Sequence, residues 1–317
     1  MRVVITGGAG FLGHRLAQRL LREERVEALT VLDVVAGPPL PDPRVRTVVG
    51  DIADPAVIGQ AIDAGTTAVF HLAAVVSGHA EADFDTGMRV NLDASRVLLE
   101  ACRAIGTRPR VVFTSSVAVY GAPGGGSLPP VVRDDTALTP QTSYGIQKAC
   151  AELLLHDYTR KGFVDGRVLR LPTVSVRPGA PNRAASSFAS GIIREPLRGV
   201  GSVCPVSPDT RVWLLSPDRA IDCLVAGHDL DAAAIGGRSI NLPGVSVSAG
   251  EMAAALERVA GPAVAALISW EPDAEIQRIA AGWPAAWDTS RATALGLVGD
   301  TDFEAIVRAH VADRDPT

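Results

Sequence analysis

Short apolar runs alternate with longer amphipathic stretches along the first half of the chain. The runs are rich in β-branched residues, whereas the stretches between them carry apolar residues three or four positions apart, which is helical spacing. Such an alternation is typical of parallel βαβ units. We therefore predict strands at residues 2–6, 28–33, 44–49, 68–72, 110–116 and 166–171, and helices at 11–24, 55–64, 84–105 and 143–161.

These elements predict an α/β fold, a doubly wound parallel sheet of the Rossmann type, over residues 1–172. Beyond them, Pro and Gly interrupt the pattern in "RPGAPNR", and mixed short elements follow. We predict a smaller mixed α/β substrate-binding lobe over 173–317. Its segments interleave with the first domain, and a segment near 211–235 packs back on that domain.

Composition narrows the possible functions. The 317 residues are 47% apolar, which is enough to bury a large core. The net charge is -5, and no basic run is present that would follow a phosphate backbone, so nucleic acid is not an expected partner. Four scattered cysteines predict neither a disulfide framework nor a metal site. With no leader and no long apolar run, we expect a cytoplasmic protein that does not enter a membrane.

The first chemical signal is "TGGAGFLG" at residues 6–13, directly after the first strand. Glycines without Cβ atoms let the backbone approach a pyrophosphate, and the following helix points its positive N-terminus at it. Many strand–helix corners carry glycines for steric reasons alone, so the context matters. Asp33 ends the second strand 20 residues after Gly13, where a carboxylate accepts from ribose hydroxyls and repels a 2′-phosphate. The pattern predicts NAD, held by Gly7, Gly10, Phe11, Leu12, Gly13 and Asp33.

Two further strand ends suit the same cofactor. "GDIAD" ends the third strand, and there a side-chain acceptor and an apolar wall can meet an adenine. "HLAA" ends the fourth, and its small residues leave the backbone open to phosphate and ribose. An ordinary turn and an ordinary buried strand end remain alternatives for each. The positions predicted to bind the cofactor are Asp51, Ile52, Leu72, Ala73 and Ala74.

"TSYGIQK" carries the second chemical signal, because Tyr144 and Lys148 lie four apart on one predicted helical face. The chain contains 28 arginines but only two lysines, so a lysine beside a tyrosine indicates a need for a compact ammonium. Such an ammonium contacts sugar hydroxyls and stabilises a phenolate that acts as a general base. The fifth strand ends in "FTSS", where Ser116 can orient a substrate oxygen, and Asn91 on the preceding helix can hold a water or a backbone group. A helix-capping serine and a solvated asparagine are the alternatives.

Taken together, "TGGAGFLG", "DIAD", "HLAA", "NLDAS", "FTSSVAVYG", "TSYGIQK" and "WDTSRATALGL" closely resemble the extended short-chain dehydrogenase/reductase family over nearly the whole chain. The resemblance implies that Tyr144 is the catalytic base and that Lys148 is its electrostatic partner and a ribose ligand. It also implies that the Ser116 hydroxyl orients the substrate and that Asn91 is the fourth member of the active set. The resemblance further implies that Asn91, Tyr144 and Lys148 bind the cofactor, and that Leu171 and Pro172 lie near the nicotinamide. A homodimer is implied through the helices at 84–105 and 143–161.

The chain departs from the nucleotide-sugar enzymes of that family, because "TRVWLLSPDRAID" lacks their acidic segment. Instead, residues 177–199 resemble the branch that oxidises the C2 hydroxyl of D-erythronate, a four-carbon sugar acid, with NAD. A helix N-terminus after "PNRAASS" can hold a small carboxylate, and a plain helix cap is the alternative. The predicted substrate-binding residues are Ser77, Ser116, Tyr144, Asn182, Arg183 and Ser187, with Ser77 and His79 expected in a loop.

Three alternatives remain for the function. A nucleotide-sugar epimerase of the same family needs room for a nucleotide, and a dehydrogenase for another aldonic or hydroxy acid shares every motif. A protein that binds NAD as a sensor tends to lose the tyrosine or the lysine, and this chain keeps both. The sequence therefore predicts hydride transfer to NAD from a small sugar acid, with a tyrosine as the base.

Overall fold

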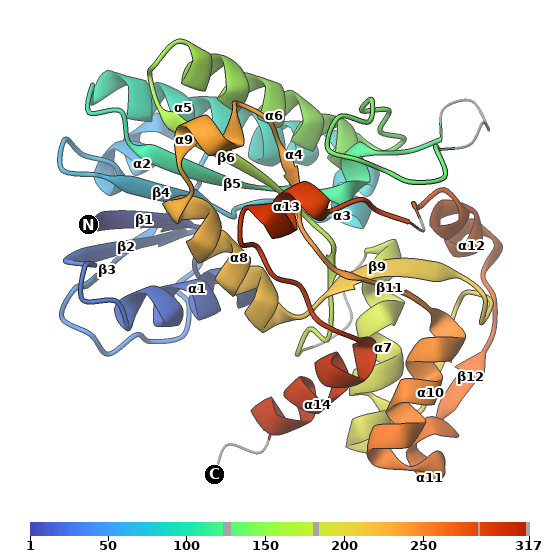
Figure 1. Cartoon of the computed structure of the whole chain (residues 1–317). Helices are drawn as coiled ribbons and strands as arrows, with labels where there is room; N and C mark the ends of the chain where they lie inside the picture. The colour runs from blue at the N-terminus through green and yellow to red at the C-terminus, as the bar shows by residue number, and fades with distance from the viewer. Residues whose placement is uncertain (123–127, 180–183, 285, 315–317) are drawn as a thin grey trace. The chain divides into compact units, whose positions relative to one another are not determined.

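The computed structural model describes residues 1–122, 128–179, 184–284 and 286–314 (Figure 1). The chain forms two compact units, each built from three segments. Unit 1 comprises Met1–Val119, Thr142–Arg170 and Ile221–Ile240, and unit 2 comprises Tyr120–Gln141, Leu171–Ala220 and Asn241–Thr317.

A seven-stranded sheet with the order β10-β6-β5-β4-β1-β2-β3 forms the centre of unit 1. β1 pairs in parallel with both β2 and β4, so the strand order reverses beside β1. This reversal is the topological switch point at which open α/β sheets bind ligands, outside the carboxyl ends of the strands. The strands are β1 (Arg2–Thr6), β2 (Ala28–Asp33), β3 (Val45–Val49), β4 (Ala68–His71), β5 (Arg110–Ser116), β6 (Asp165–Leu171) and β10 (Ile240–Asn241).

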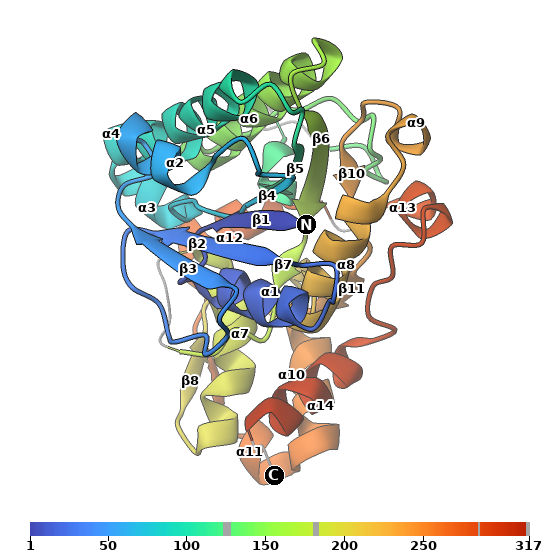
Figure 2. The ribbon, with the colours of Figure 1, turned by 90° about the vertical axis from the view of Figure 1, so that its left-hand side faces the viewer.

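Helices cover both faces of this sheet (Figures 1 and 2). One face carries α1 and α8, and the other carries α2, α5 and α6. On the face with α2, α5 and α6, the core buries Val69, Val111 and Phe113 of the sheet with Leu98 of α5 and Leu155 of α6. The helices of this unit, with α8 starting in unit 2, are α1 (Phe11–Leu21), α2 (Pro55–Ala61), α3 (Ser77–Ala82), α4 (Phe84–Gly87), α5 (Ala94–Ala104), α6 (Ser143–Arg160), α8 (Pro217–Asp229) and α9 (Ala232–Ile235).

The region after β4 differs from the sequence prediction. The single helix expected at 84–105 is three pieces, because the π-helix η1 (Met88–Asp93) separates α4 from α5. A π-turn adds a residue to one turn and often lies at a functional site, and here it carries Asn91. The loop expected around Ser77 and His79 is the short helix α3, followed by Asp83, whose carboxylate caps α4 through the Thr86 N–H.

Unit 2 has a core of its own, made of Phe188, Ile192, Leu214, Met252 and Phe303 with their neighbours. A three-stranded sheet, β11-β9-β7, and a parallel pair, β12 with β8, support it. Its elements are β7 (Thr173–Val174), η4 (Ala185–Ser187), α7 (Phe188–Arg194), η5 (Pro196–Arg198), β8 (Ser202–Cys204), β9 (Arg211–Leu215), β11 (Val245–Ser248), α10 (Ala249–Ala260), α11 (Pro262–Ala265), β12 (Ile268–Trp270), α12 (Ala274–Ala281), α13 (Ser290–Ala294) and α14 (Phe303–Arg314). The short helix η2 (Val117–Val119) ends the first segment of unit 1.

The predicted fold class is confirmed: a Rossmann-type parallel sheet lies between two layers of helices. Among the residues that the structure describes, no helix is both long enough and apolar enough to span a bilayer.

Candidate functional site

The glycine-rich turn lies at the switch point, between β1 and α1. Gly7 has a φ of +72°, and a Cβ atom there would lie 2.7 Å from the backbone nitrogen of Ala73. A Cβ at Gly13 would lie 2.1 Å from the carbonyl oxygen of Gly7, so α1 packs directly on the turn. Gly10, Phe11 and Leu12 form the start of α1, where no side chain caps the helix and its first turn holds no acidic residue. The turn is thus a backbone cradle beside a helix N-terminus, which fits a pyrophosphate.

Asp33 stands at the end of β2, beside this turn. One carboxylate oxygen accepts from the Ala9 N–H at 3.0 Å, and the other accepts from the Val34 N–H at 2.8 Å. These bonds fix the carboxylate against the glycine-rich turn, and each oxygen keeps a further lone pair for a ribose hydroxyl.

Asp51 and Ile52 follow β3, as predicted from "GDIAD". Asp51 accepts from the Ala53 N–H at 2.9 Å and forms an ion pair with Arg89 of η1. Ile52 is buried in the core of unit 1. The carboxylate expected to meet an adenine therefore already has a cationic partner.

The segment after β4 forms one wall of the glycine-rich turn. The Leu72 N–H donates to the Thr6 carbonyl at 3.1 Å, which continues the β1–β4 pairing. Ala73 lies against Gly7, and Ala74 is exposed. Ser77 begins α3 and is half-buried.

Tyr144 and Lys148 lie one turn apart on α6, as their spacing predicted. Thr142 begins this helix, because its hydroxyl oxygen accepts from the Gly145 N–H at 3.1 Å. The Lys148 Nζ atom lies 5.8 Å from the centre of the Tyr144 ring and donates to the Thr114 carbonyl at 2.9 Å. It also lies 4.6 Å from the centre of the Phe113 ring. The ammonium is buried, whereas the tyrosine is half-buried, so the phenol is the accessible member of the pair.

Ser116 ends β5 and is half-buried, and its Oγ atom accepts from the Ala118 N–H at 3.1 Å. The Ala118 N–H uses a lone pair of this oxygen and leaves the hydroxyl its own proton to donate. Asn91 is buried, and its side chain holds a backbone group, that of Val75. All four residues, Ser116, Tyr144, Lys148 and Asn91, thus belong to unit 1, on β5, α6 and η1.

The remaining predicted residues lie outside unit 1. Leu171 ends β6, Pro172 follows it, and both are buried in unit 2. Ser187 ends the short helix η4 of the same unit and is half-buried. Asn182 and Arg183, the other predicted ligands of a substrate carboxylate, lie outside the described residues.

A profile described as "NAD dependent epimerase/dehydratase family" matches residues 3–214. This chain belongs to that family. The match contains the glycine-rich turn, Ser116, Tyr144 and Lys148, and the expected resemblance to extended short-chain dehydrogenases is thereby confirmed.

Several relatives of the family are similar over their whole length. A protein of Cupriavidus necator named "D-erythronate dehydrogenase" is 61% identical, over 99% of this chain and 98% of its own. A protein of the same name from Haemophilus influenzae is 46% identical, over 98% of this chain and 99% of its own. The crystal structure of a nucleoside-diphosphate-sugar epimerase from Agrobacterium tumefaciens is 43% identical, covers 99% of this chain and 94% of its own, and has a TM-score of 0.92.

The predicted class of the protein, an oxidoreductase that depends on NAD, is confirmed by these comparisons. The residues present also fit the cofactor, since Cβ atoms at Gly7 and Gly13 would fill the cradle beside α1. Asp33 holds its carboxylate at the same turn. These residues would hold NAD through backbone N–H groups and a ribose acceptor.

Sequence reasoning missed two buried polar networks of this site. His71 of β4 lies between the Thr6 hydroxyl at 2.8 Å and the Ser95 hydroxyl at 3.0 Å. Because Ser95 donates to the Asn91 carbonyl, its oxygen accepts from the imidazole. Burial, with a smaller effect from the Lys148 charge, lowers the pKa of His71 to about 3, so the imidazole of His71 is uncharged at neutral pH.

The second network lies one turn beyond Lys148. Glu152 of α6 pairs with Arg170 of β6 at 2.7 Å, and both side chains are buried. The same carboxylate accepts from Ser115, the neighbour of Ser116, and from Ser239 at 3.0 Å. No sequence signal marked this network, because other charged residues also lie on α6 and β6.

The burial of Lys148 predicts a pH-dependent stability. Burial lowers the pKa of Lys148 from 10.5 to about 7, although the Glu152 charge opposes the shift. Below that pH the lysine is charged in both states, and the folded chain bears the whole cost of burying the charge. Above it the folded chain releases the proton while the unfolded chain keeps it, so stability rises with pH.

We therefore expect the free energy of unfolding of wild type, relative to Lys148→Met, to increase by about 2 kcal/mol from pH 7 to pH 9. Urea unfolding of both proteins across this range, without cofactor, measures the difference. The exposed Lys161 is the only other lysine, and Lys161→Met is the control with no such slope. A flat difference for Lys148→Met would show that the ammonium is well solvated.

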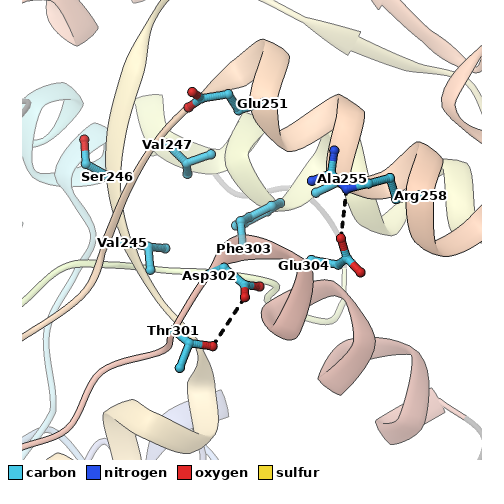
Figure 3. Close-up of a pocket in the computed structure, with 10 residues that line it drawn as sticks. All are labelled: Val245, Ser246, Val247, Glu251, Ala255, Arg258, Thr301, Asp302, Phe303 and Glu304. Atoms are coloured by element: carbon cyan, nitrogen blue, oxygen red, sulfur yellow. Dashed lines mark hydrogen bonds and ion pairs between the residues drawn. The ribbon is translucent and has the colours of Figure 1, made fainter.

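A separate hollow of about 630 Å³ lies in unit 2, lined by β11, α10 and the start of α14 (Figure 3). Its lining contains the carboxylates of Glu251, Asp302 and Glu304 and one arginine, Arg258. This arginine already pairs with Glu304 at 2.8 Å. Three carboxylates would repel an anionic sugar acid. None of the predicted site residues lines this hollow.

Proposed function

We propose that this protein is a D-erythronate dehydrogenase, which oxidises the C2 hydroxyl of that acid to a ketone. The observation that carries the proposal is the 61% identity, over 99% of the chain, with a protein of that name. The arrangement of Tyr144, Lys148 and Ser116 in unit 1 supports it, because these groups suit the removal of a proton from an alcohol.

In the proposed reaction, the Tyr144 phenolate removes the proton from the C2 hydroxyl, and the Ser116 hydroxyl donates to the same oxygen. Lys148, when protonated, places a positive charge one helical turn from the phenolate, and the Thr114 carbonyl accepts from its Nζ atom at 2.9 Å. NAD, when bound, supplies the acceptor for the hydride that leaves C2. The products are 2-dehydro-D-erythronate, NADH and one proton, so atoms and electrons balance.

For the substrate carboxylate we propose Asn182, Arg183 and Ser187 as ligands, and for a substrate hydroxyl we propose Ser77. A guanidinium with hydroxyl donors suits a small carboxylate, because charged donors bind such a group strongly and with defined geometry. The proposal keeps the residues that the sequence predicted.

A panel assay tests the substrate directly. The purified protein is incubated with NAD and with D-erythronate, L-erythronate, D-threonate, L-threonate and L-threonine, and NADH is followed by absorbance. We expect the highest kcat/KM with D-erythronate. Faster oxidation of another acid would replace D-erythronate within the same mechanism, and no NADH with any of them would reject the proposed function.

A second candidate is a nucleotide-sugar epimerase, since a 43% identical solved structure is described as one. The sequence departs from such enzymes in "TRVWLLSPDRAID". In unit 2, Arg211 pairs with Glu251 at 3.1 Å, and the Ser216 N–H donates to Asp300 at 2.7 Å. Calorimetric titration with UDP discriminates the two: the dehydrogenase proposal expects no measurable binding, and binding at micromolar UDP favours the epimerase.

We also propose that the protein is a homodimer through α6 and the helical region from residue 84. Ile146 and Leu153, two turns apart on α6, have exposed fractions of 49% and 65%, and Phe84 of α4 has 59%. Exposed apolar side chains on one helical face favour a protein interface.

We expect Leu153→Glu to convert the dimer to a monomer, because it introduces charges into an interface that excludes water. Sedimentation velocity measures the change. Val298 of unit 2 is also exposed, at 55%, and Val298→Glu is the control that should leave the mass unchanged. A wild-type monomer at micromolar concentration would contradict the proposal.

A further inference from the structure

Gln147 lies on α6 between Tyr144 and Lys148, and its side chain is only 1% exposed. Its Oε1 atom accepts from the Asn91 Nδ2 atom at 2.8 Å. Its Nε2 atom has no hydrogen-bond partner among the described residues. A buried donor without a partner costs about 1–3 kcal/mol. An apolar side chain of the same size would avoid this cost, so stability alone does not explain a glutamine here.

The orientation of this amide is fixed by a chain of donors and acceptors that begins at the backbone. The Val75 N–H donates to the Asn91 Oδ1 atom at 2.9 Å, which turns the Nδ2 atom toward the Val75 carbonyl at 3.2 Å and toward Gln147. The Gln147 amide must therefore present its oxygen to Asn91, because the opposite orientation would set two NH₂ groups against each other. The unpaired Nε2 donor of Gln147 is a consequence of that series of hydrogen bonds.

The neighbouring backbone leaves room for this arrangement. A Cβ atom at Gly87 of α4 would lie 2.6 Å from the Gln147 Nε2 atom and 3.1 Å from Oε1. Any larger residue at position 87 would displace the amide from Asn91. A glycine on α4 and a glutamine on α6 thus fit each other.

The other end of this series of hydrogen bonds is Val75, in the segment that forms the wall of the cofactor cradle. Val75 follows Ala73 and Ala74, and the Ala73 backbone nitrogen lies 2.7 Å from where a Cβ of Gly7 would stand. Asn91 clamps both the N–H and the carbonyl of Val75, so it fixes the path of this segment. Gln147 is the connection between that clamp and the helix that carries Tyr144 and Lys148.

We propose that Gln147 is a positioning residue, which holds the Ala73–Val75 segment in register with Tyr144 and Lys148 through Asn91. Cofactor affinity then depends on a side chain that is not expected to touch the cofactor. The inference rests on the proposed function only for the identity of the substrate, since NAD binding is measured without it.

Gln147→Met tests this role, because methionine has a similar size and shape but offers Asn91 only a thioether sulfur, which is a weak acceptor. We expect the Kd for NAD, measured by calorimetry, to rise about tenfold, the effect of losing one buried hydrogen bond. The melting temperature should change little, because the unpaired Gln147 donor is removed at the same time. Gln277 of unit 2 also makes partly buried side-chain bonds, since it accepts from the Ser207 N–H and donates to the Thr210 hydroxyl. Gln277→Met is the control that should lower the melting temperature without changing the Kd.

A double-mutant cycle with Asn91→Ala tests whether the effect passes through Asn91. We expect Gln147→Met to add no further loss of NAD affinity in that background. An unchanged Kd in Gln147→Met, or an equal additional loss in the Asn91→Ala background, would overturn the inference. If Gln147→Met does not fold, Gln147→Asn, which is shorter by one carbon, tests the same link with the same expectations. Wild type that binds NAD but fails to oxidise D-erythronate would reject only the proposed substrate.

Discussion

Tyr144→Phe is expected to lower kcat for sugar-acid oxidation by at least about 10³-fold, because the general base is lost and a proton remains on the C2 oxygen. The Kd for NAD should stay within about threefold of wild type, since the phenyl ring keeps its size and its distance from Lys148. NADH absorbance gives the rate, and calorimetry gives the affinity. The Ser116 hydroxyl still orients the oxygen in the variant, but it cannot take the proton without a base of its own.

Tyr158→Phe is the matched control for this experiment. It removes a hydroxyl from the same helix, but that hydroxyl donates to Glu100 and has no role in the proposed reaction. Burial, together with the Glu100 carboxylate, raises the pKa of Tyr158 to about 12, so it remains a neutral phenol. Turnover by Tyr158→Phe should equal that of wild type. If Tyr144→Phe kept a tenth or more of the wild-type rate, another group would have to be the base.

The elements of unit 1 could be predicted because each has its own local signal. β1 reads as an apolar run, and its last four residues are buried. The glycine-rich turn could be predicted in detail, because positive φ at Gly7 and close approach at Gly13 both exclude a Cβ atom. The spacing of Tyr144 and Lys148 is likewise local, since four residues make one helical turn.

The parts that could not be predicted depend on contacts between distant segments. A π-turn has no composition of its own, so nothing in "MRVNLD" separated η1 from an ordinary helix. Gln147 and Glu152 look like solvated helix residues, and only the packing of η1, β5 and β6 against α6 buries them. A helix pattern gives the period of the apolar face but not which polar residues are enclosed by their neighbours.

Glu152→Leu is expected to lower the free energy of unfolding by about 3–5 kcal/mol, because it leaves the Arg170 guanidinium buried without its carboxylate. Glu152 and Arg170 have exposed side-chain fractions of 1% and 5%, so water cannot replace the missing partner. Unfolding by guanidinium chloride measures the loss of stability. Glu257→Leu on α10, where the glutamate is exposed, is the control and should change stability by less than about 0.5 kcal/mol.

The double variant Glu152→Leu/Arg170→Met separates the cost of an unpaired charge from the value of the pair. Removing both charges should recover at least half of the loss, since apolar replacement of a buried ion pair is often nearly neutral. Ser115 would still lack its acceptor, and it adjoins Ser116 at the end of β5. We therefore expect the double variant to regain stability without regaining the full kcat. Full recovery of both would mean that the pair contributes to the fold alone, and a loss below about 1 kcal/mol in Glu152→Leu would contradict its burial.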